Sequence, residues 1–305
     1  MDLITVYTPT FNRGQLLTRV YDSLCRQTYS GFVWLIIDDG STDTTKGLVD
    51  GWLAENILKI KYVYRENGGL HTARDMAYRI CDTELIVGCD SDDYFVDNAI
   101  EQIIDVWKNE GSDYYAGIIT QTMNEAGECL VSNFPDVHHA TYQDFTYKHK
   151  CVGDKKTILR TSVIAAIPEN PVFPGEKFLA EGFKWIQLPE NRPFLLVRRP
   201  LYVIDYQTDG YSNNVAAHRY NNPNGFRASS RQHIISSKYL RPRIKGHIGY
   251  IAFSIILKDQ RFIINSPNPL VTMLLLPLGL MAYIYFAWQR RKHEKNSNNH
   301  IPQSS

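Results

Sequence analysis

The sequence predicts an α/β fold in which a mostly parallel sheet is flanked by helices. Over about the first 110 residues, short apolar stretches alternate with stretches of helical length, and each apolar stretch is followed by a polar turn. The fourth apolar stretch, residues 85–89, leads directly into Asp90, Asp92 and Asp93. This alternation is typical of parallel sheets with right-handed helical crossovers, whose strands end at a common edge.

Three strand, turn and helix units come first. Their strands are rich in apolar and β-branched residues, and apolar residues recur every three or four positions in their helices. We expect the first strand to end before Pro9, because proline lacks the backbone donor that a sheet uses. The predicted strands are residues 3–8, 32–37 and 60–64, and the predicted helices are residues 15–27, 44–53 and 70–80.

After the acidic turn a helix is expected to begin near Val96. Beyond Tyr114 the alternation weakens. Residues 118–123 and 128–131, joined by a turn, predict a hairpin, and residues 194–206 predict a further strand.

The C-terminal part changes character. From Pro269 to Trp288 only Thr272 is polar, and this length is sufficient to span a bilayer. Pro277 lies in the middle of the stretch, however, and basic residues flank it on both sides, so the positive-inside rule gives no orientation. We therefore expect a helix or a broken pair of helices that lies in the interface of the inner membrane face. The alternative is a buried core helix.

Aromatic residues and basic flanks would anchor such a segment at the membrane surface. The residues that follow, 293–305, are polar and are expected to be disordered. The basic flanks are Arg241, Arg243 and Lys245 before the segment and Arg290, Arg291 and Lys292 after it, and the aromatic anchors are Tyr283, Tyr285, Phe286 and Trp288.

The overall composition narrows the class of protein. The chain has 305 residues, with 33 basic and 32 acidic side chains and a net charge of +1, which argues against nucleic acid as the main partner. Its five cysteines form no Cys-x-x-Cys pair, which favours a reduced cytosolic setting over a disulfide framework or a zinc site. The first residues have no basic region followed by an apolar one, so we expect no secretory signal.

The acidic turn after the fourth strand carries the most distinctive chemistry. No basic residue lies between Asp90 and Asp93, and like charges so close together repel unless a cation intervenes. Hard oxygen ligands suit Mg²⁺ or Mn²⁺, and such an ion typically completes its shell with water and substrate phosphates. The alternative is that Asp92 or Asp93 merely caps the following helix.

Polar clusters follow all four strands. In this order and spacing they resemble the nucleotide-sugar half of the family-two inverting glycosyltransferases, of the bacterial cell-surface glycan type, whose Rossmann-like fold is called GT-A. The resemblance covers about the first 110 residues and extends loosely to Tyr211. It is specific because the Asp-Asp-Gly-Ser-Thr-Asp turn and the acidic strand end occur together. The clusters are residues 8–13, 38–43, 67–69 with Arg74, and 90–93.

The resemblance implies contacts to a sugar donor. Thr8, Pro9 and Asp39 would contact the base and ribose of a nucleoside diphosphate, usually uridine. Asp39 can accept a hydrogen bond from the ring N–H of uracil; the alternative is that Asp38 and Asp39 form an ordinary turn. Asp43 is expected to cap the next helix.

The same resemblance implies which residues lie near the sugar and the phosphates of the donor. Gly69 would permit close approach of the donor, and Arg74 matches the family's nucleotide-side arginine, with a solvated helix charge as the alternative. Asp90 would face the ribose or the sugar. Asp92, together with Asp93, would hold the Mn²⁺ or Mg²⁺ that bridges the two phosphates.

An inverting transfer also needs a base that takes the proton of the acceptor hydroxyl. The family uses a carboxylate after the second half of the sheet, usually in a Glu-Asp pair, whereas this chain has Glu-Gly at Glu181, and Glu176 is a rival. We favour Glu181 because it opens a predicted helix with Phe183 and Trp185 nearby to exclude water. The alternative is that Glu181 forms a surface ion pair with Lys184.

A polar, aromatic loop at residues 206–214 follows the last predicted strand. Related enzymes have a flexible loop here that closes over the diphosphate and the acceptor, so Tyr211 or Ser212 would touch the leaving group. The alternative is a plain surface turn.

The sequence therefore predicts a metal-dependent inverting glycosyltransferase that moves a sugar from a nucleoside diphosphate sugar to a hydroxyl of a glycan or lipid-linked acceptor. Asp92 and Glu181 would be its catalytic residues. We expect it in the cytoplasm, attached to the inner membrane face. The predicted domains are a nucleotide-sugar half at 1–115, an acceptor half at 116–215, a helical membrane-associating region at 216–292 and the tail 293–305.

The sequence fits other functions less well. A non-catalytic sugar-nucleotide binder or membrane scaffold, and a nucleotidyltransferase, remain alternatives. A dinucleotide-dependent oxidoreductase is excluded because the first turn lacks G-x-G-x-x-G, and a P-loop enzyme because no G-K-[ST] is present. The sequence does not indicate the oligomeric state.

Overall fold

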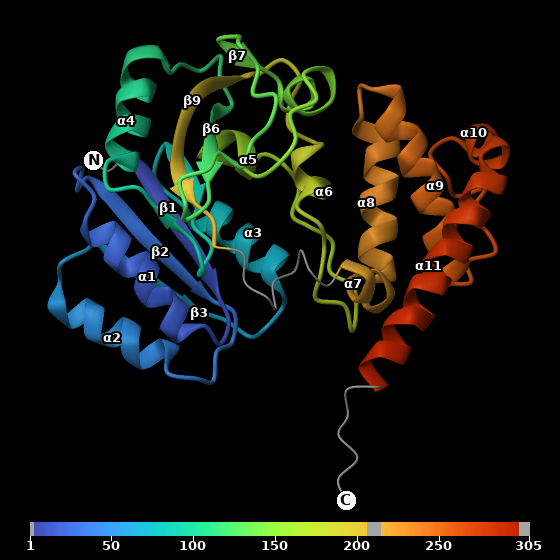
Figure 1. Ribbon diagram of the computed structural model, residues 1–305, viewed down its shortest axis with the longest axis horizontal. Coiled ribbons are helices and arrows are strands. Elements are labelled where there is room, and N and C mark those ends of the chain that lie inside the picture. The colour runs from blue at the N-terminus through green and yellow to red at the C-terminus, as the bar shows by residue number, and fades with distance from the viewer. Residues whose placement is uncertain (1–2, 206–214, 299–305) are drawn as a thin grey trace, which may run out of the picture. The chain divides into compact units, whose positions relative to one another are not determined.

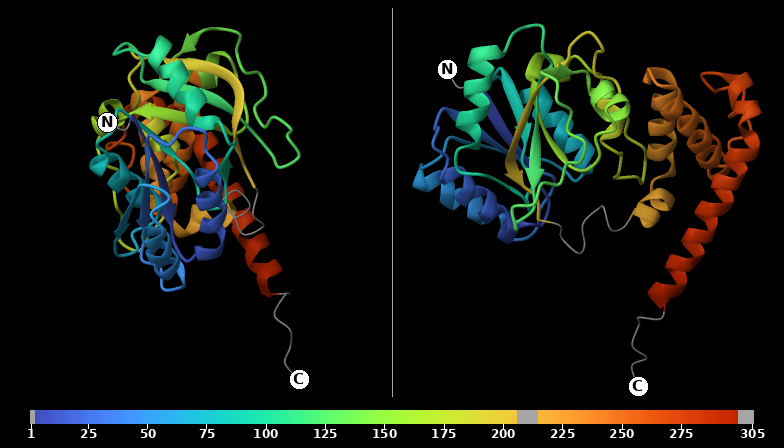
Figure 2. Two further views of the ribbon diagram at one scale, coloured as in Figure 1. Left: turned by 90° about the vertical axis from the view of Figure 1, so that its left-hand side faces the viewer. Right: turned by 45° about the horizontal axis from the view of Figure 1, so that its top comes forward.

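The computed structural model describes residues 3–205 and 215–298. The chain folds into two compact units (Figures 1 and 2). Unit 1 comprises Met1–Glu169 and Leu188–Gln207, and unit 2 comprises Asn170–Gln187 and Thr208–Ser305. Unit 1 contains the sheet, and unit 2 is helical.

Unit 1 is built on a nine-stranded sheet with the order β3-β2-β1-β4-β8-β6-β9-β5, and β7 pairs with β9. The strands β3, β2, β1 and β4 are parallel, as predicted, whereas β8 joins β4 in antiparallel orientation. The strands are β1 Ile4–Thr10, β2 Phe32–Asp38, β3 Ile60–Tyr64, β4 Leu85–Gly88, β5 Tyr94–Phe95, β6 Gly117–Met123, β7 His139–Ala140, β8 Lys155–Arg160 and β9 Phe194–Val203.

Helices cover both faces of this sheet (Figure 1). On one face α1, α2 and α4 bury a core in which Tyr21 stacks on Trp52, with ring centroids 4.5 Å apart, beside Trp34. On the other face α3 packs against β1 and β2, and Tyr78 meets Tyr7 edge to face. The helices of unit 1 are α1 Gly14–Cys25, α2 Thr45–Glu55, α3 Leu70–Ile80, α4 Ala99–Glu110 and α5 Thr161–Ala165, with a π-helical turn at Asp144–Lys148.

The prediction that the first strand stops before Pro9 is wrong. β1 continues to Thr10, and Pro9 lies opposite Ile37 of β2. The pairing of β1 with β4 ends at Tyr7 and Gly88, so beyond Tyr7 the strand has a partner on one side only. A proline is tolerated at such a position, because its missing N–H removes no ladder bond on the open side.

The later strands depart further from the expected pattern. The turn expected at 124–127 is present, with Gly127 N–H donating to Asn124 O, but its second arm contributes only a single bridge between Met123 and Cys129. The helix expected near Val96 begins at Ala99, because residues 94–95 form β5 instead. The strand expected at 194–206 ends at Val203 as β9.

Unit 2 contains six helices in its described part, and α8, α9 and α11 form its main packing layer. The predicted apolar segment 269–288 is a broken pair, because α10 ends at Leu274 and α11 begins at Leu276. Pro277 thus lies in the first turn of α11, where proline is well tolerated. The helices are α6 Gly182–Trp185, α7 Val215–Asn221, α8 Pro223–Ser236, α9 Leu240–Ile256, α10 Pro269–Leu274 and α11 Leu276–Asn298.

The helix α11 runs through the first residues of the expected tail 293–305 and ends at Asn298, and residues 299–305 lie outside the described part. Across the described residues, none of the helices combines the length and the apolar character that a transmembrane span requires.

Candidate active site

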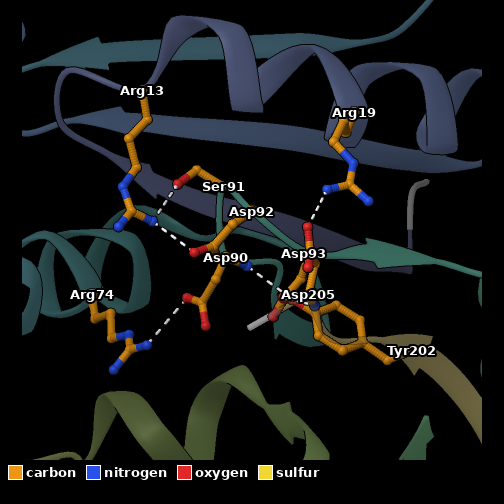
Figure 3. Close-up of polar contacts among 9 residues, drawn as sticks. All are labelled: Arg13, Arg19, Arg74, Asp90, Ser91, Asp92, Asp93, Tyr202 and Asp205. Carbon is orange, nitrogen blue, oxygen red and sulfur yellow. Dashed lines mark hydrogen bonds and ion pairs between the residues drawn. The ribbon is translucent and has the colours of Figure 1, made fainter. Parts of the chain in front are cut away.

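The ends of the parallel strands bring the predicted polar clusters to one edge of the sheet. β1, β2 and β4 run in the same direction, so the turns that follow them lie side by side. In open α/β sheets this carboxyl edge is where ligands bind. Figure 3 shows the acidic turn after β4 between Arg13, which follows β1, and Arg74 of α3.

Two of the three aspartates in this turn are paired with arginines. Arg13 Nη1 lies 2.8 Å from Asp92 Oδ2, and Arg74 Nη2 lies 3.2 Å from Asp90 Oδ1. The Arg74 side chain is 13% exposed, so it is not the solvated helix charge of the alternative prediction. The Asp90 side chain is 43% exposed and therefore remains accessible beside its arginine.

Asp93 faces a different set of partners (Figure 3). It is buried, and its Oδ1 accepts a hydrogen bond of 3.1 Å from the backbone N–H of Asp205, just after β9. The Asp205 carboxylate in turn binds Arg19 of α1 at 2.5 Å. The hydroxyl oxygen of Tyr202 in β9 accepts a hydrogen bond of 2.9 Å from the backbone N–H of Asp90. This bond ties the start of the acidic turn to β9.

Burial and neighbouring charges shift the pKa values of the three aspartates in this turn in different directions. Burial raises the pKa of Asp93 to about 7, with the charge of Asp90 adding to the effect and Lys156 opposing it. Burial likewise raises the pKa of Asp92, although the Arg13 charge opposes it. At Asp90 partial desolvation by the surrounding protein also disfavours the charge, but Arg74 and Lys156 outweigh it and hold the pKa below its ordinary value.

These contacts change the argument for a metal. The acidic turn itself contains no basic residue, but in three dimensions Arg13, Arg74 and Lys156 bring positive charge to its carboxylates. Over residues 3–205 and 215–298, no three His, Cys, Asp or Glu side chains are grouped so that they could hold a metal ion. Asp92 and the more exposed Asp90 can each offer a carboxylate oxygen to an ion whose shell is completed by phosphates and water.

The acidic turn after β2 is bound by backbone groups. Asp38 is fully buried and accepts from the N–H of Ser41 at 2.7 Å and from the hydroxyl of Tyr62 at 2.6 Å. Asp39 is 4% exposed and accepts from the N–H groups of Gly68 and Gly69 at 3.0 and 2.8 Å. The two carboxylates therefore hold together the loops that follow β2 and β3.

Asp43 and Gly69, which the sequence also singled out, lie at the starts of two helices next to this turn. Asp43 Oδ1 accepts from the N–H of Thr45 at 3.0 Å, so it caps α2 as expected, and its Oδ2 accepts from the N–H of Gly14 at the start of α1. Burial works against the charge of Asp43, yet these hydrogen bonds lower its pKa. Gly69 directly precedes α3 and has φ +93°, a left-handed conformation that favours glycine.

The β1 residues expected to contact the donor are part of the sheet. Thr8 is fully buried, and its hydroxyl oxygen accepts from Trp34 Nε1 at 2.9 Å. Pro9 is likewise buried within β1. A contact of Thr8 or Pro9 with the sugar donor thus stays a prediction. The Thr8 hydroxyl oxygen already accepts a hydrogen bond from Trp34 in the core.

In unit 2 the two candidate bases have different environments. Glu176 is buried, and its carboxylate accepts from the N–H groups of Asn224 and Gly225 in the first turn of α8, at 2.9 and 2.8 Å. It is therefore a helix cap. Glu181 directly precedes α6, as predicted, and is exposed rather than shielded from water. Tyr211 and Ser212 lie outside the described residues.

Several residues at the strand-end site were missed as site residues. Lys156 of β8 places its Nζ 3.3 Å from the centroid of the Tyr202 ring, beside Asp90 and Asp93. Tyr202 and Asp205 arrive from the end of unit 1, more than a hundred residues from the acidic turn. Only Arg13 had a local signal, because it lies in the polar cluster after β1.

Comparisons with known proteins point to one family. The profile described as Glycosyl transferase family 2 matches residues 5–167, which is more than half of the chain. The glycosyltransferase GlyG of Streptococcus pneumoniae serotype 4 is 29% identical over 117 residues, and the match covers 38% of each protein. The aligned stretch thus spans well under half the length of that relative.

Solved structures show the same fold. TarS residues 1–349 of S. aureus, in complex with UDP-GlcNAc, superpose with a TM-score of 0.60 at 16% identity, covering 94% of this chain and 81% of TarS. The mannosyltransferase PcManGT of Pyrobaculum calidifontis, in complex with GDP-Man and Mn²⁺, gives 0.52 at 15% identity and covers 98% and 81%. With its mixed sheet, its strand-end cluster and the profile match over residues 5–167, the chain belongs to glycosyl transferase family 2.

Proposed function

We propose that this chain is an inverting glycosyltransferase that moves a sugar from a nucleoside diphosphate sugar to a hydroxyl of a glycan or lipid-linked acceptor. A uridine donor is favoured, since a carboxylate has about four lone-pair sites, and Asp39 can accept from the N–H of uracil while it keeps the N–H groups of Gly68 and Gly69. Support comes from membership of the family and from the fold shared with a protein bound to UDP-GlcNAc.

One observation carries the proposal. Asp90 and Asp92 are held by the side chains of Arg74 and Arg13, at the edge of the sheet where ligands bind. A guanidinium can pass from a carboxylate to phosphate oxygens with the same fork of donors. The cluster can therefore rearrange around a diphosphate while the backbone that carries it stays fixed.

The transfer is a single displacement. The acceptor oxygen forms a bond to the anomeric carbon as the bond from that carbon to the diphosphate oxygen breaks, and the nucleoside diphosphate leaves with the electron pair. Glu181 is the proposed base that takes the acceptor proton. Glu176 is the weaker candidate, because its carboxylate is bound by backbone N–H groups of α8.

A divalent cation fits this scheme through Asp92. Mn²⁺ or Mg²⁺ bound there would neutralise charge on the departing diphosphate. Asp93, its expected second ligand, would first have to leave the N–H of Asp205. PcManGT, which shares the fold, was solved with GDP-Man and Mn²⁺. Arg13, released from Asp92, would then be free to bind a phosphate oxygen.

The test is release of free sugar and nucleoside diphosphate from a panel of UDP- and GDP-sugars by the full chain, with Mn²⁺ and with a chelator. We expect release that depends on the metal and is abolished by Asp92→Ala and by Glu181→Gln. The matched controls Asp97→Ala and Glu169→Gln remove carboxylates of exposed ion pairs with Arg26 and Arg79 and should leave the activity unchanged.

Other results would overturn the proposal. Binding of a nucleotide sugar without release, in the presence of every metal and acceptor mixture tried, would indicate a non-catalytic binder. Formation of pyrophosphate from a nucleoside triphosphate and a sugar phosphate would indicate a nucleotidyltransferase. Equal loss in the Asp97→Ala control would remove the special role of Asp92.

A further inference from the structure

The helix α11 is apolar on two opposite faces. Its inner face packs on α9 within unit 2: Gly279 lies against Ile251, and Phe286 stacks on Phe253 with ring centroids 5.4 Å apart. A Cβ on Gly279 would lie 2.4 Å from a methyl carbon of Ile251, so the two helices are in close contact here.

The outer face of α11 has apolar side chains at helical spacing that other side chains leave exposed. Leu278, Met281, Ile284, Tyr285 and Trp288 recur every three or four residues and are 45 to 65% exposed. We call these five residues, with the exposed apolar residues of α10 and the preceding segment, the outer apolar face. The additional members are Ile264, Leu270, Met273 and Leu274, which are 55 to 79% exposed.

Soluble proteins seldom expose so many large apolar side chains within one short stretch, here residues 264–288. The expectation that four aromatic residues anchor this segment needs correction, because Phe286 belongs to the inner face. Tyr285 and Trp288 remain as exposed aromatic residues, and their rings stack with centroids 6.2 Å apart. Tyr and Trp are the residues that favour the boundary between lipid and water.

The charged residues in the stretch that carries the outer apolar face are mostly basic. Between residues 257 and 292 the basic residues outnumber the acidic residues by five to one. The single acid, Asp259, is already paired with Arg227 at 3.0 Å. Three of the basic residues follow Trp288 almost directly, and all five are exposed: Lys258, Arg261, Arg290, Arg291 and Lys292.

We propose that the outer apolar face binds the surface of an anionic lipid bilayer, with α10 and α11 lying in the interface rather than crossing it. Its apolar side chains would enter the boundary between headgroups and acyl chains, and its basic residues would meet anionic headgroups. A second copy of the chain fits less well, because a self-complementary contact would offer these basic residues almost no acidic partner.

The proposal is tested by sedimentation of the full chain with vesicles of phosphatidylcholine, with and without phosphatidylglycerol. We expect binding to the anionic vesicles that weakens with salt. The double variant Met281→Glu with Ile284→Glu should lower the bound-to-free ratio at least about tenfold, because two charges enter the lipid boundary. Arg291→Glu with Lys292→Glu should lower it about tenfold or more on anionic vesicles, with little effect on neutral ones.

The chain offers a matched control in unit 1. Ile57 and Val152 are 63 and 64% exposed, close to the 65 and 63% of Met281 and Ile284. Ile57→Glu with Val152→Glu therefore adds the same charges at equally exposed positions outside the proposed surface. This control should bind vesicles as the unchanged chain does, and all variants should keep its melting temperature.

Trp288 provides a second readout that does not depend on the glutamate variants. Brominated lipid should quench part of the tryptophan fluorescence of the unchanged chain, and Trp288→Phe should remove that quenching.

The proposal is overturned by absence of binding to anionic vesicles, by equal loss in the Ile57 and Val152 control, or by quenching that persists in Trp288→Phe. It is also overturned if light scattering finds a dimer that the Met281 and Ile284 variant dissociates while vesicles stay unbound. None of these measurements requires a sugar donor, so this proposal and the proposed reaction fail independently.

Discussion

Two acidic turns at the same edge of the sheet differ in what binds their carboxylates. After β2, Asp38 and Asp39 are buried and accept from the backbone N–H groups of Ser41, Gly68 and Gly69. After β4, the carboxylates of Asp90 and Asp92 are met by arginine side chains. The amino-acid composition of the two turns is similar, so the turns differ in burial and in the partners of their carboxylates, although Arg65 also lies 3.4 Å from Asp39.

This difference separates a turn whose carboxylates mainly hold two loops together from a turn whose side-chain partners can be exchanged for a ligand. A backbone N–H cannot leave its carboxylate without moving the loop, whereas an arginine side chain can rotate to another anion at little cost to the fold. We therefore expect changes after β2 to act mainly on stability, and changes after β4 to act mainly on turnover. The following predictions test this division, in order of decreasing effect.

The largest effect is expected at Asp92. Asp92→Asn keeps the shape of the side chain but removes the charge, and we expect the rate of sugar transfer to fall about 10³-fold, as when one electrostatic group of a transition state is removed. The free energy of unfolding should change by less than about 1 kcal/mol, because the Arg13 contact is partly exposed. Steady-state kinetics and chemical denaturation measure the two quantities. A variant that keeps more than a tenth of the transfer rate would break the comparison on this side.

Asp39 should show the opposite pattern in stability. Asp39→Ala leaves the N–H groups of Gly68 and Gly69 and the nearby Arg65 without their buried acceptor. We expect a loss of about 3 kcal/mol in the free energy of unfolding. Asp97→Ala, in the exposed pair with Arg26, should cost less than about 1 kcal/mol. Similar denaturation midpoints for the two variants would show that the β2 turn is not held by Asp39.

Gly40 tests the same loop through its backbone. It has φ +91°, and a Cβ there would lie 2.9 Å from the backbone nitrogen of Asn67. Gly40→Ala should therefore cost about 2 kcal/mol in the free energy of unfolding. Gly47→Ala in α2 is the control, because its Cβ would meet nothing within 4 Å, and it should stabilise by about 0.5–1 kcal/mol. If both variants unfold alike in thermal melts, the close approach of the two loops is unimportant.

The smallest effect concerns pH at His71, which is buried in α3 next to the loop that Asp39 holds. Burial lowers its pKa, although Asp75 and Asp39 oppose the shift. The unfolded chain then binds a proton more readily than the folded one, so the stability that neutral His71 provides is present above about pH 6.5 and is lost as the pH falls toward the folded pKa. His71→Gln should flatten this acid-side decline in the free energy of unfolding. Parallel pH profiles for the two chains would exclude the linkage.

Local sequence patterns predicted the elements that local interactions determine. The bounds expected for β3 and α3 agree with the structure, and the acidic turn lies at the end of β4 as its position after an apolar run indicated. Of the partners of that turn, Arg74 was predicted as a site residue, whereas Lys156, Tyr202 and Asp205 were not predictable, because they arrive through β8 and β9 from distant parts of the chain. The two-residue strands β5 and β7 are too short to carry a periodic signal.

The contact between Gly279 and Ile251 has a consequence for α11 as a whole. A helix with apolar residues all round has no intrinsic preference for which side it hides. The missing side chain at Gly279 provides one place where α9 can approach, and this sets the rotation of α11 about its own axis. A larger residue at 279 would turn or lift the helix, and a different set of residues would then be presented to the solvent.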